Sequence, residues 1–317
     1  MPEPHILLQK HIPEIIQLTL GKWNQANLLS SELFDQTYIE SFLADVLTDI
    51  LTNHPGYGFS QNGKLISYLI GYSGIPSLKG KELGSYIPLW GHYISKNDFD
   101  TFFTLYSMLA KDWLKSDVFT HIITCLPCYS LLQENLYILG FGLLVIDAIR
   151  SLKPISIPPL KSKFLLRSMT SDDFQVFNQI EQDFCSYMQS SPTFLYTPPS
   201  DCESPLSEFI ADGRRTFVVE YQGTLVAAIR GILGKSNFDL LNQPRSIGIN
   251  YAYTDPKFRG FGLGTHLVNE VLKYGQDNQA SYCTVDFESA NLLAKRFWLA
   301  YFTPIGYSSI RKIDNRL

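Results

Sequence analysis

Charged side chains are scarce in this chain of 317 residues. Lys, Arg, Asp and Glu make up 18% of it, and the formal net charge is −4. Nucleic-acid-binding proteins usually carry a clustered basic face, so this composition predicts no nucleic-acid partner. Hydrophobic residues reach 45%, enough to fill two cores, and a chain of this length usually forms two domains.

Long apolar runs and export signals are also lacking. The longest apolar run, residues 136–149, spans about 14 residues, whereas roughly 20 are needed to cross a bilayer. The first eight residues lack the basic segment and apolar stretch of a secretory signal. We therefore expect no membrane partner and a cytoplasmic protein.

Cysteine is rare, with five residues in all. An odd number without an export signal predicts free thiols in a reducing compartment. Cys125 and Cys128 form one C-x-x-C pair, but no second pair or histidine cluster completes a zinc site, and we expect no metal. A redox pair stays open. The simpler interpretation is two small apolar residues at the end of a strand.

Glycine is concentrated in one informative segment, Tyr253-Thr-Asp-Pro-Lys-Phe-Arg-Gly-Phe-Gly-Leu-Gly264. It follows an apolar, strand-like stretch and leads into a helical pattern that begins near Gly264. Gly260, Gly262 and Gly264 allow several backbone N–H groups to turn toward one point. The helix adds its own free N–H groups and the positive end of its dipole. This segment, with Arg259 as a permanent cation, predicts a pyrophosphate-binding loop at residues 259–265.

Two other glycine loops fit this segment less well. A P-loop requires a Lys-Ser/Thr pair, which does not follow these glycines. A dinucleotide-binding loop has G-x-G-x-x-G directly after the strand and an acid about 20 residues later. Here Thr265 stands where the third glycine belongs, although Asp286 lies at about the right distance. The dinucleotide interpretation therefore stays open.

The run from Thr254 to Gly264, T-D-P-x-x-R-G-x-G-x-G, resembles the coenzyme A loop of the GNAT (GCN5-related N-acetyltransferase) superfamily. In that family the loop ends the fourth strand and begins the third helix. The run from Val285 to Phe302, which contains Asn291, resembles the family's fifth strand and fourth helix. The resemblance implies a mostly antiparallel α/β (α+β) sheet flanked by helices. It also implies transfer of an acetyl group from acetyl-CoA to a primary amine of a small acceptor.

The same resemblance implies the cofactor contacts. A bulge near residues 250–253 would part strand four from strand five and leave room for pantetheine. Backbone groups of strand four would pair with pantetheine, and loop N–H groups would hold the pyrophosphate. The residues assigned to cofactor binding are Tyr253, Thr254, Arg259, Gly260, Phe261, Gly262, Leu263, Gly264, Thr265 and Asn291.

The general base is harder to assign. Many family members carry a carboxylate on strand four, but residues 246–254 contain none. The nearest acids by element are Glu220, Asp286 and Glu288. We expect Glu288 to act as the base because it ends its strand, nearest the point where the two strands part.

The general acid departs from the family pattern as well. Trp298 stands where the family usually has a tyrosine, and an indole N–H cannot serve as an acid at working pH. We expect Tyr301 to replace it, with Tyr251 and Tyr253 as alternatives. These departures leave a second function open, a protein that binds acyl-CoA without turnover.

The chain also repeats itself with an offset of about 160 residues, as the Gly63 and Gly223 hairpin signals show. We expect two tandem GNAT-like domains, residues 1–150 and 164–317, joined by a proline-rich linker at 151–163. Residues 94–104 correspond to the glycine loop but contain no glycine, no arginine and two aspartates. The N-terminal copy is therefore predicted to have lost cofactor binding, which leaves one active site. Nothing in the sequence indicates the oligomeric state.

Overall fold

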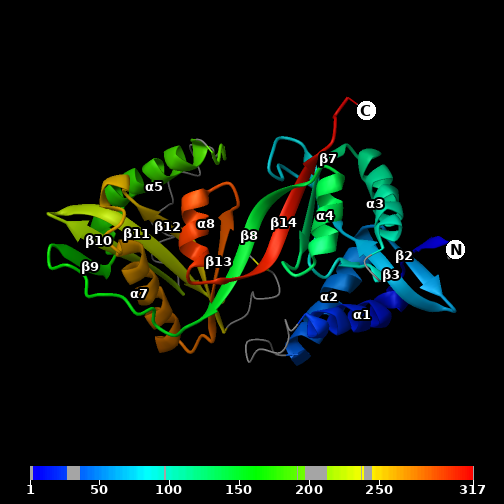
Figure 1. The fold of residues 1–317 in the computed structure, drawn as a ribbon, viewed down its shortest axis with the longest axis horizontal. Coiled ribbons are helices and arrows are strands. Elements are labelled where there is room, and N and C mark those ends of the chain that lie inside the picture. The colour runs from blue at the N-terminus through cyan, green and yellow to red at the C-terminus, as the bar shows by residue number, and fades with distance from the viewer. Residues whose placement is uncertain are drawn as a thin grey trace. The chain divides into compact units, whose positions relative to one another are not determined.

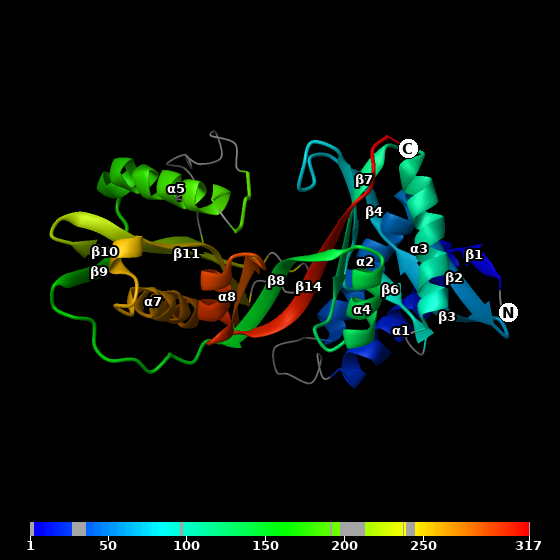
Figure 2. The same cartoon turned by 45° about the horizontal axis from the view of Figure 1, so that its top comes forward.

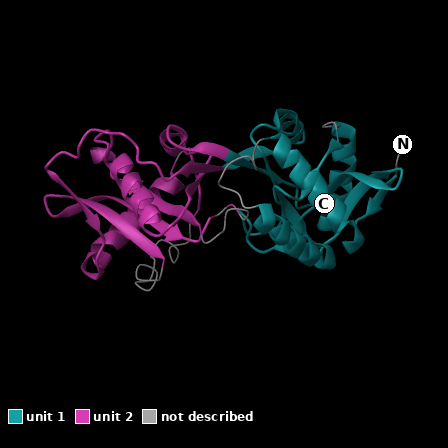
Figure 3. Ribbon diagram, turned by 90° about the horizontal axis from the view of Figure 1, so that it is seen from below, with its two compact units in different colours: residues 1–145, 305–317 teal, residues 146–304 magenta. Residues whose placement is uncertain are grey.

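The computed structural model describes residues 3–26, 36–95, 98–190, 192–196, 213–236, 238 and 245–316. It contains two compact units (Figure 3). Unit 1 comprises residues 1–145 and 305–317, and unit 2 comprises residues 146–304. Both have mixed α/β architecture, which confirms the predicted fold class. No helix among the described residues has the length and apolarity required to span a bilayer.

Unit 2 holds one mixed sheet with the strand order β8-β13-β12-β11-β10-β9. Strands β9 to β12 are antiparallel neighbours, while β12 and β13 are parallel. Helix α5 covers one face of this sheet and α7 the other (Figures 1 and 2). The elements are β9 (Phe164–Ser168), η3 (Ser171–Asp173), α5 (Phe174–Gln189), β10 (Arg214–Tyr221), β11 (Thr224–Leu233), β12 (Ser246–Thr254), η6 (Pro256–Phe258), α7 (Leu263–Asp277), β13 (Tyr282–Glu288) and α8 (Leu292–Leu299).

The α7 face of the sheet shows why these residues form these elements. Leu263, Leu267 and Val271 recur at helical spacing and are all buried, as an amphipathic helix on a sheet requires. Opposite them, β11 carries Gly231. A Cβ at that position would lie 2.9 Å from a Val271 methyl group, so glycine lets the helix pack close to the sheet.

Unit 1 holds two sheets. One has the order β1-β2-β3-β6 and is antiparallel, and the other contains β4-β5-β7-β14, with β5 and β7 parallel. The elements are β1 (Pro4–Ile6), η1 (Gln9–His11), α1 (Ile12–Gln25), α2 (Gln36–Asn53), β2 (Gly56–Gln61), β3 (Lys64–Ile70), β4 (Tyr72–Ile75), β5 (Leu83–Ile87), β6 (His92–Tyr93), α3 (Phe99–Leu114), β7 (Val118–Cys125), α4 (Ser130–Ile138), β8 (Gly142–Ser151) and β14 (Thr303–Lys312).

The hairpins β2–β3 and β10–β11 confirm the predicted repeat. Their turns, at residues 62–63 and 222–223, all have positive φ angles between 51° and 81°. Each hairpin also has a register shift, after Phe59 in one and after Val219 in the other. These two residues correspond under the predicted offset, so the two halves share a local irregularity as well as an order of elements.

The two halves exchange their last strands. β14, from the C-terminal half, pairs antiparallel with β7 in unit 1, from Tyr307 opposite Cys125 to Lys312 opposite Thr120. The second part of β8, from Ile146 on, belongs to unit 2, where β8 neighbours β13. The boundaries expected at residues 150 and 164 follow the sequence repeat, whereas the two compact units group residues that contact one another in space. The boundaries by repeat stay a prediction.

Unit 1 differs from unit 2 at the counterpart of β12. In unit 2, β12 pairs with both β11 and β13. In unit 1 the equivalent strand is broken into β5, which pairs with β7, and β6, which pairs with β3. Pro88 and Gly91 lie in the break, and a Cβ on Gly91 would approach the Ile70 carbonyl oxygen to 2.5 Å. This break divides the unit 1 sheet in two.

Candidate active site

Strand β12 carries a bulge and then parts from β13. Arg230 on β11 faces Tyr251, whereas Gly231 faces Ile249, so Asn250 is the extra residue of the bulge. The parallel pairing of β12 with β13 ends at Ile249 opposite Val285. The bulge therefore lies in the predicted range, and beyond it no strand among the described residues pairs with the β13 side of β12.

Glycine is required at the three loop positions for different structural reasons. Gly260 and Gly262 have φ angles of 81° and 79°, a region that side chains with a Cβ rarely adopt. A Cβ on either would meet open space. Gly264 instead has a close neighbour, because a Cβ there would lie 3.2 Å from the Phe297 ring. Two glycines thus shape the loop, and the third allows α7 to approach α8.

The loop leaves a run of backbone donors free. In the described part of the chain, the N–H groups of residues 260–264 have no hydrogen-bond acceptor, whereas those of Thr265 and His266 donate to the Gly262 carbonyl. Gly262 is the N-cap of α7 and provides no side-chain cap. Five consecutive unpaired donors at the positive end of a helix suit a phosphate group.

The corresponding helix of unit 1 is closed to an anion. Asp98 is the N-cap of α3, and its carboxylate accepts hydrogen bonds from the Asp100 N–H and the Thr101 hydroxyl. This carboxylate occupies the first turn of α3, and the loss of cofactor binding in the N-terminal copy stays a prediction.

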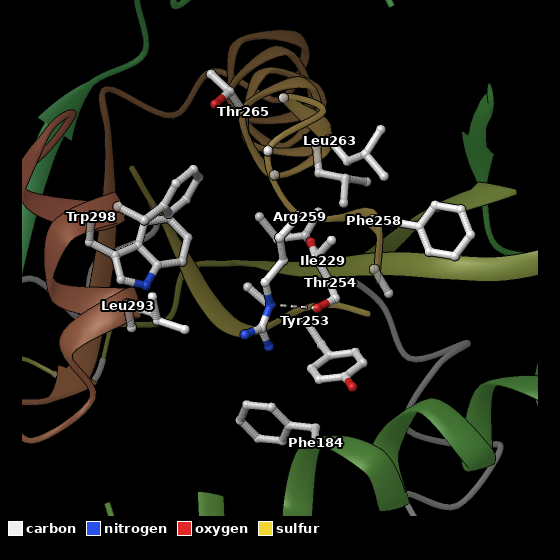
Figure 4. Close-up of a pocket in the computed structure, with 18 of the residues that line it drawn as sticks. Phe184, Ile229, Tyr253, Thr254, Phe258, Arg259, Leu263, Thr265, Leu293 and Trp298 are labelled. Carbon is white, nitrogen blue, oxygen red and sulfur yellow. Dashed lines mark hydrogen bonds between the residues drawn. The ribbon is translucent and has the colours of Figure 1, made fainter. Parts of the chain in front are cut away.

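Arg259 braces the glycine loop. Its Nε donates to the Thr254 carbonyl oxygen over 3.1 Å, drawn as the dashed line in Figure 4. Its guanidinium carbon lies 5.0 Å from the centre of the Tyr187 ring. These two contacts connect the Arg259 side chain to β12 and α5.

A cavity of about 490 Å³ opens between α5, the end of β12, the glycine loop and α8. Trp298 and Leu293 of α8 lie across it from Phe258 (Figure 4). Nine of the ten residues assigned to cofactor binding line it, namely Tyr253, Thr254, Arg259, Gly260, Gly262, Leu263, Gly264, Thr265 and Asn291. Phe261, the tenth, lies outside the wall and packs on Phe164 with ring centres 5.6 Å apart.

Neither predicted catalytic residue is part of the cavity wall. Tyr301 lies behind it, where its hydroxyl accepts a 3.3 Å hydrogen bond from the Thr265 hydroxyl. Glu288 ends β13, and its backbone carbonyl accepts the Asn291 N–H. The described residues of the wall include no carboxylate. The hydroxyl groups in it belong to Tyr187, Tyr253 and threonines.

Tyr253 is the alternative acid that does face the cavity. Burial raises its pKa, and the negative charges of Asp183 and Asp255 act in the same direction. The phenol therefore holds its proton at neutral pH. Tyr251, the other alternative, is buried, and its hydroxyl donates to the Ile180 carbonyl in the α5 core.

The sequence interpretation did not identify the α5 side of the cavity. Phe184 and Tyr187 project from α5, and the Tyr187 hydroxyl donates to the Asn291 Oδ1 over 2.8 Å. The sequence signal that could have indicated this wall is the helical spacing of four aromatic and aliphatic residues, which lie on one face of a helix: Phe177, Ile180, Phe184 and Tyr187.

The C-x-x-C pair begins at the end of a strand, as the simpler interpretation expects, but only its first cysteine is buried. Cys125 is buried at the end of β7, Cys128 is exposed, and both are free thiols, as is Cys283. Cys185 is disulfide-bonded, so the expectation of free thiols throughout is wrong at that residue.

Comparison with known proteins identifies a family for part of the chain. Residues 177–302 match the model of the acetyltransferase (GNAT) family. No curated protein matches the chain.

Solved structures extend the likeness to the whole chain. The chain is similar to a GCN5-related N-acetyltransferase from Sphaerobacter thermophilus, with 12% identity, coverage of 98% of this chain and 95% of that chain, and a TM-score of 0.56. It is also similar to the glucosamine N-acetyltransferase region of a fungal multi-domain β-N-acetylglucosaminidase, with 11% identity, 98% and 38% coverage and a TM-score of 0.51. A tandem GNAT protein from the clavulanic acid biosynthesis pathway matches with 12% identity, 98% coverage of both chains and a TM-score of 0.48.

The matched family model spans the bulged strand, the glycine loop and α8, which together form the cavity. Residues 177–302 therefore form a GNAT acetyltransferase domain, and the chain as a whole shares the fold of solved GNAT structures.

Proposed function

We propose that the chain is an N-acetyltransferase that moves an acetyl group from acetyl-CoA to the primary amine of a small acceptor. One observation carries the proposal. The N–H groups of residues 260–264 have no acceptor among the described residues, and four of these residues, Gly260, Gly262, Leu263 and Gly264, line the cavity beside the end of β12. A phosphate-binding loop beside an unpaired strand edge suits a cosubstrate with a pyrophosphate and an amide-bearing arm.

The chain's own groups would position this substrate. The loop N–H groups bind the pyrophosphate, and Arg259 keeps the loop in shape. Backbone groups of Tyr253 and Thr254 bind the pantetheine arm as an added strand. Asn291, buried at the start of α8, faces the same space. Such prior ordering lowers the entropic cost of bringing the thioester and the amine together.

Proton transfer is the second requirement. An alkyl amine with a pKa near that of lysine, about 10.4, is almost wholly protonated at neutral pH and must lose a proton before it attacks. With no carboxylate among the described wall residues, we propose that Glu288 accepts this proton through water. We propose Tyr253 as the donor to the departing thiolate, because it faces the cavity and keeps its proton. Tyr301 remains the second candidate.

A second function, acyl-CoA binding without turnover, is favoured by two observations. Trp298 lines the cavity where the family pattern has a tyrosine, and no described wall residue is a carboxylate. This protein would bind acetyl-CoA but release no thiol when amines are added.

Amine-dependent thiol release from acetyl-CoA tests the proposal, with a panel of small primary amines as acceptors. We expect release by the wild type, and at least a tenfold lower kcat for Tyr253→Phe and for Glu288→Gln. Tyr137→Phe and Glu134→Gln, at exposed positions of α4, are the matched controls and should retain full activity. A Tyr301→Phe variant with the larger loss would transfer the acid role to Tyr301. Tight acetyl-CoA binding without release from any amine would favour the second function.

A further inference from the structure

Unit 1 has a cavity of its own, about 550 Å³ in volume. We call it the Lys22 cavity. It lies between α1, the start of β3 and β6, and its described lining residues are Glu14, Gln17, Leu18, Gly21, Lys22, Gln25, Lys64, Leu65 and Tyr93. It lies outside the acetyl-transfer site described above.

The repeat relates this cavity to the one in unit 2. α1 follows η1 as α5 follows η3, so Lys22 takes the place of Phe184. By the offset of 160 that relates the hairpins, Tyr93 takes the place of Tyr253. Tyr129, the N-cap of α4, corresponds to the N-cap Asn291 of α8. Three lining residues of the Lys22 cavity, Lys22, Gln25 and Tyr93, thus correspond to Phe184, Tyr187 and Tyr253 in the wall of the unit 2 cavity.

The Lys22 ammonium has aromatic neighbours. Its Nζ lies 4.1 Å from the centre of the Tyr129 ring and 5.6 Å from that of Tyr93. Both distances are within the range of a cation–π contact. Such contacts partly replace hydration, but they provide no opposite charge. Lys22 forms no ion pair with any carboxylate that the structure describes.

The nearest carboxylates are engaged elsewhere. Glu14 shares the cavity, and its Oε2 accepts the Leu65 N–H over 2.6 Å. Asp98 lines a small pocket with Lys22, but both its oxygens cap the first turn of α3. Neither carboxylate lies within 4 Å of the ammonium.

The other titratable groups near Lys22 are uncharged at neutral pH. Burial raises the pKa of Cys125 to about 12, and it also raises the pKa values of Cys128 and Tyr129. Burial lowers the pKa of His92 to about 3. Burial also lowers the pKa of Lys22 itself to about 8, as expected of a cation removed from water without a partner.

We propose that the Lys22 cavity is a second ligand site, which binds a small organic carboxylate through the Lys22 ammonium with the rings of Tyr93 and Tyr129 beside it. A carboxylate ligand supplies the negative charge that no described residue places within 4 Å of the ammonium. Pyrophosphate does not suit this site, because Asp98 closes the α3 terminus and Glu14 would repel additional charge. The proposal does not depend on acetyl transfer in unit 2.

Calorimetry on the full-length chain at pH 8.5 tests the proposal, with phenylacetate as the probe and phenylacetamide as its uncharged isostere. We expect phenylacetate to bind at least tenfold more tightly than the amide. Proton uptake should accompany binding, because an anion at Lys22 raises the pKa of the ammonium. Two buffers of different ionisation enthalpy would reveal this uptake.

Variants locate the site. Lys22→Met should lower phenylacetate affinity at least tenfold, whereas Lys111→Met, an exposed lysine of α3 outside the cavity, should leave it unchanged. Equal binding of acid and amide, equal binding by Lys22→Met, or no binding at millimolar concentration would each overturn the proposal.

A second measurement uses the wild-type chain and so does not depend on whether a variant folds. In protein labelled with carbon-13 at lysine Cε, phenylacetate should raise the titration midpoint of one low-pKa lysine by one pH unit or more. No change in any lysine signal would contradict the proposal.

Discussion

The Tyr187 hydroxyl donates to the Asn291 Oδ1 over 2.8 Å, which connects α5 to the first turn of α8 across the cavity. The same oxygen accepts the Ala294 N–H over 3.1 Å, because Asn291 is the N-cap of α8. The Arg259 guanidinium lies over the ring of Tyr187. One tyrosine thus connects the glycine loop, α5 and α8, and so holds three walls of the cavity.

Removal of this hydroxyl should loosen the cavity without unfolding the chain. A hydrogen bond contributes about 1 kcal/mol, so Tyr187→Phe should weaken CoA binding about fivefold. Asn291→Ala should also lower stability by about 1 kcal/mol, because it removes the helix cap. Calorimetry and urea unfolding on both variants and the double variant check this. Strictly additive effects on CoA affinity would argue against coupling between the two residues.

Gly264 should tolerate a methyl group only if Phe297 becomes smaller. A Cβ at Gly264 would lie 3.2 Å from the Phe297 ring, so Gly264→Ala should destabilise the chain by about 1 kcal/mol. Phe297→Leu in the same chain should recover part of that loss by vacating the space. Thermal unfolding of the single and double variants measures it. If Gly264→Ala were as stable as the wild type, the close packing of α7 against α8 would be contradicted.

Stability should fall in mild acid because of two buried histidines in unit 1. Burial lowers the pKa of His92 to about 3 and that of His121 to about 4, both below the ordinary 6.5. Between these values and 6.5 the unfolded chain binds protons that the folded chain does not, so stability declines as pH falls through this window. From pH 6.5 to 5 the loss should be about 2 kcal/mol for each histidine.

Replacing these histidines should flatten that pH dependence. His92 donates to the Thr124 carbonyl oxygen, and His121 bonds with the Tyr106 hydroxyl, so glutamine is the polar replacement. Urea unfolding midpoints between pH 4 and 8 for the wild type and the His92→Gln His121→Gln variant test this. A variant that is less stable at pH 8 but keeps the full decline below pH 6.5 would rule out these two residues as its cause.

Local features of the fold and the cofactor loop were predictable from sequence. Positive φ at Gly260 and Gly262 and the paired hairpins depend on residues close together in the chain, whereas the bulge at Asn250 was expected only from the family resemblance. Glycine conformational freedom and strand alternation determine such features locally. The missing loop in the N-terminal copy was visible for the same reason.

Features that depend on contacts between distant residues were not predictable. β8 and β14 are both apolar strands that follow a helix, and their composition does not show which sheet each one joins. Alternation places Asp286 and Glu288 on one strand face, but it does not say whether that face meets the cavity. Likewise, the spacing of α5 shows its buried face but not that Tyr187 reaches Asn291.

The central claim is that the loop at residues 260–264 binds the pyrophosphate of CoA, and calorimetric titration of the whole chain with CoA tests it most directly. We predict one CoA per chain and at least a tenfold loss of affinity for Gly262→Ala, whose φ of 79° disfavours a side chain. Gly223→Ala is the matched control, since it has a φ of 81° with equally open space in a hairpin turn and should bind CoA normally. Two tightly bound CoA per chain, unchanged affinity in Gly262→Ala, or no binding by the intact chain would contradict the claim.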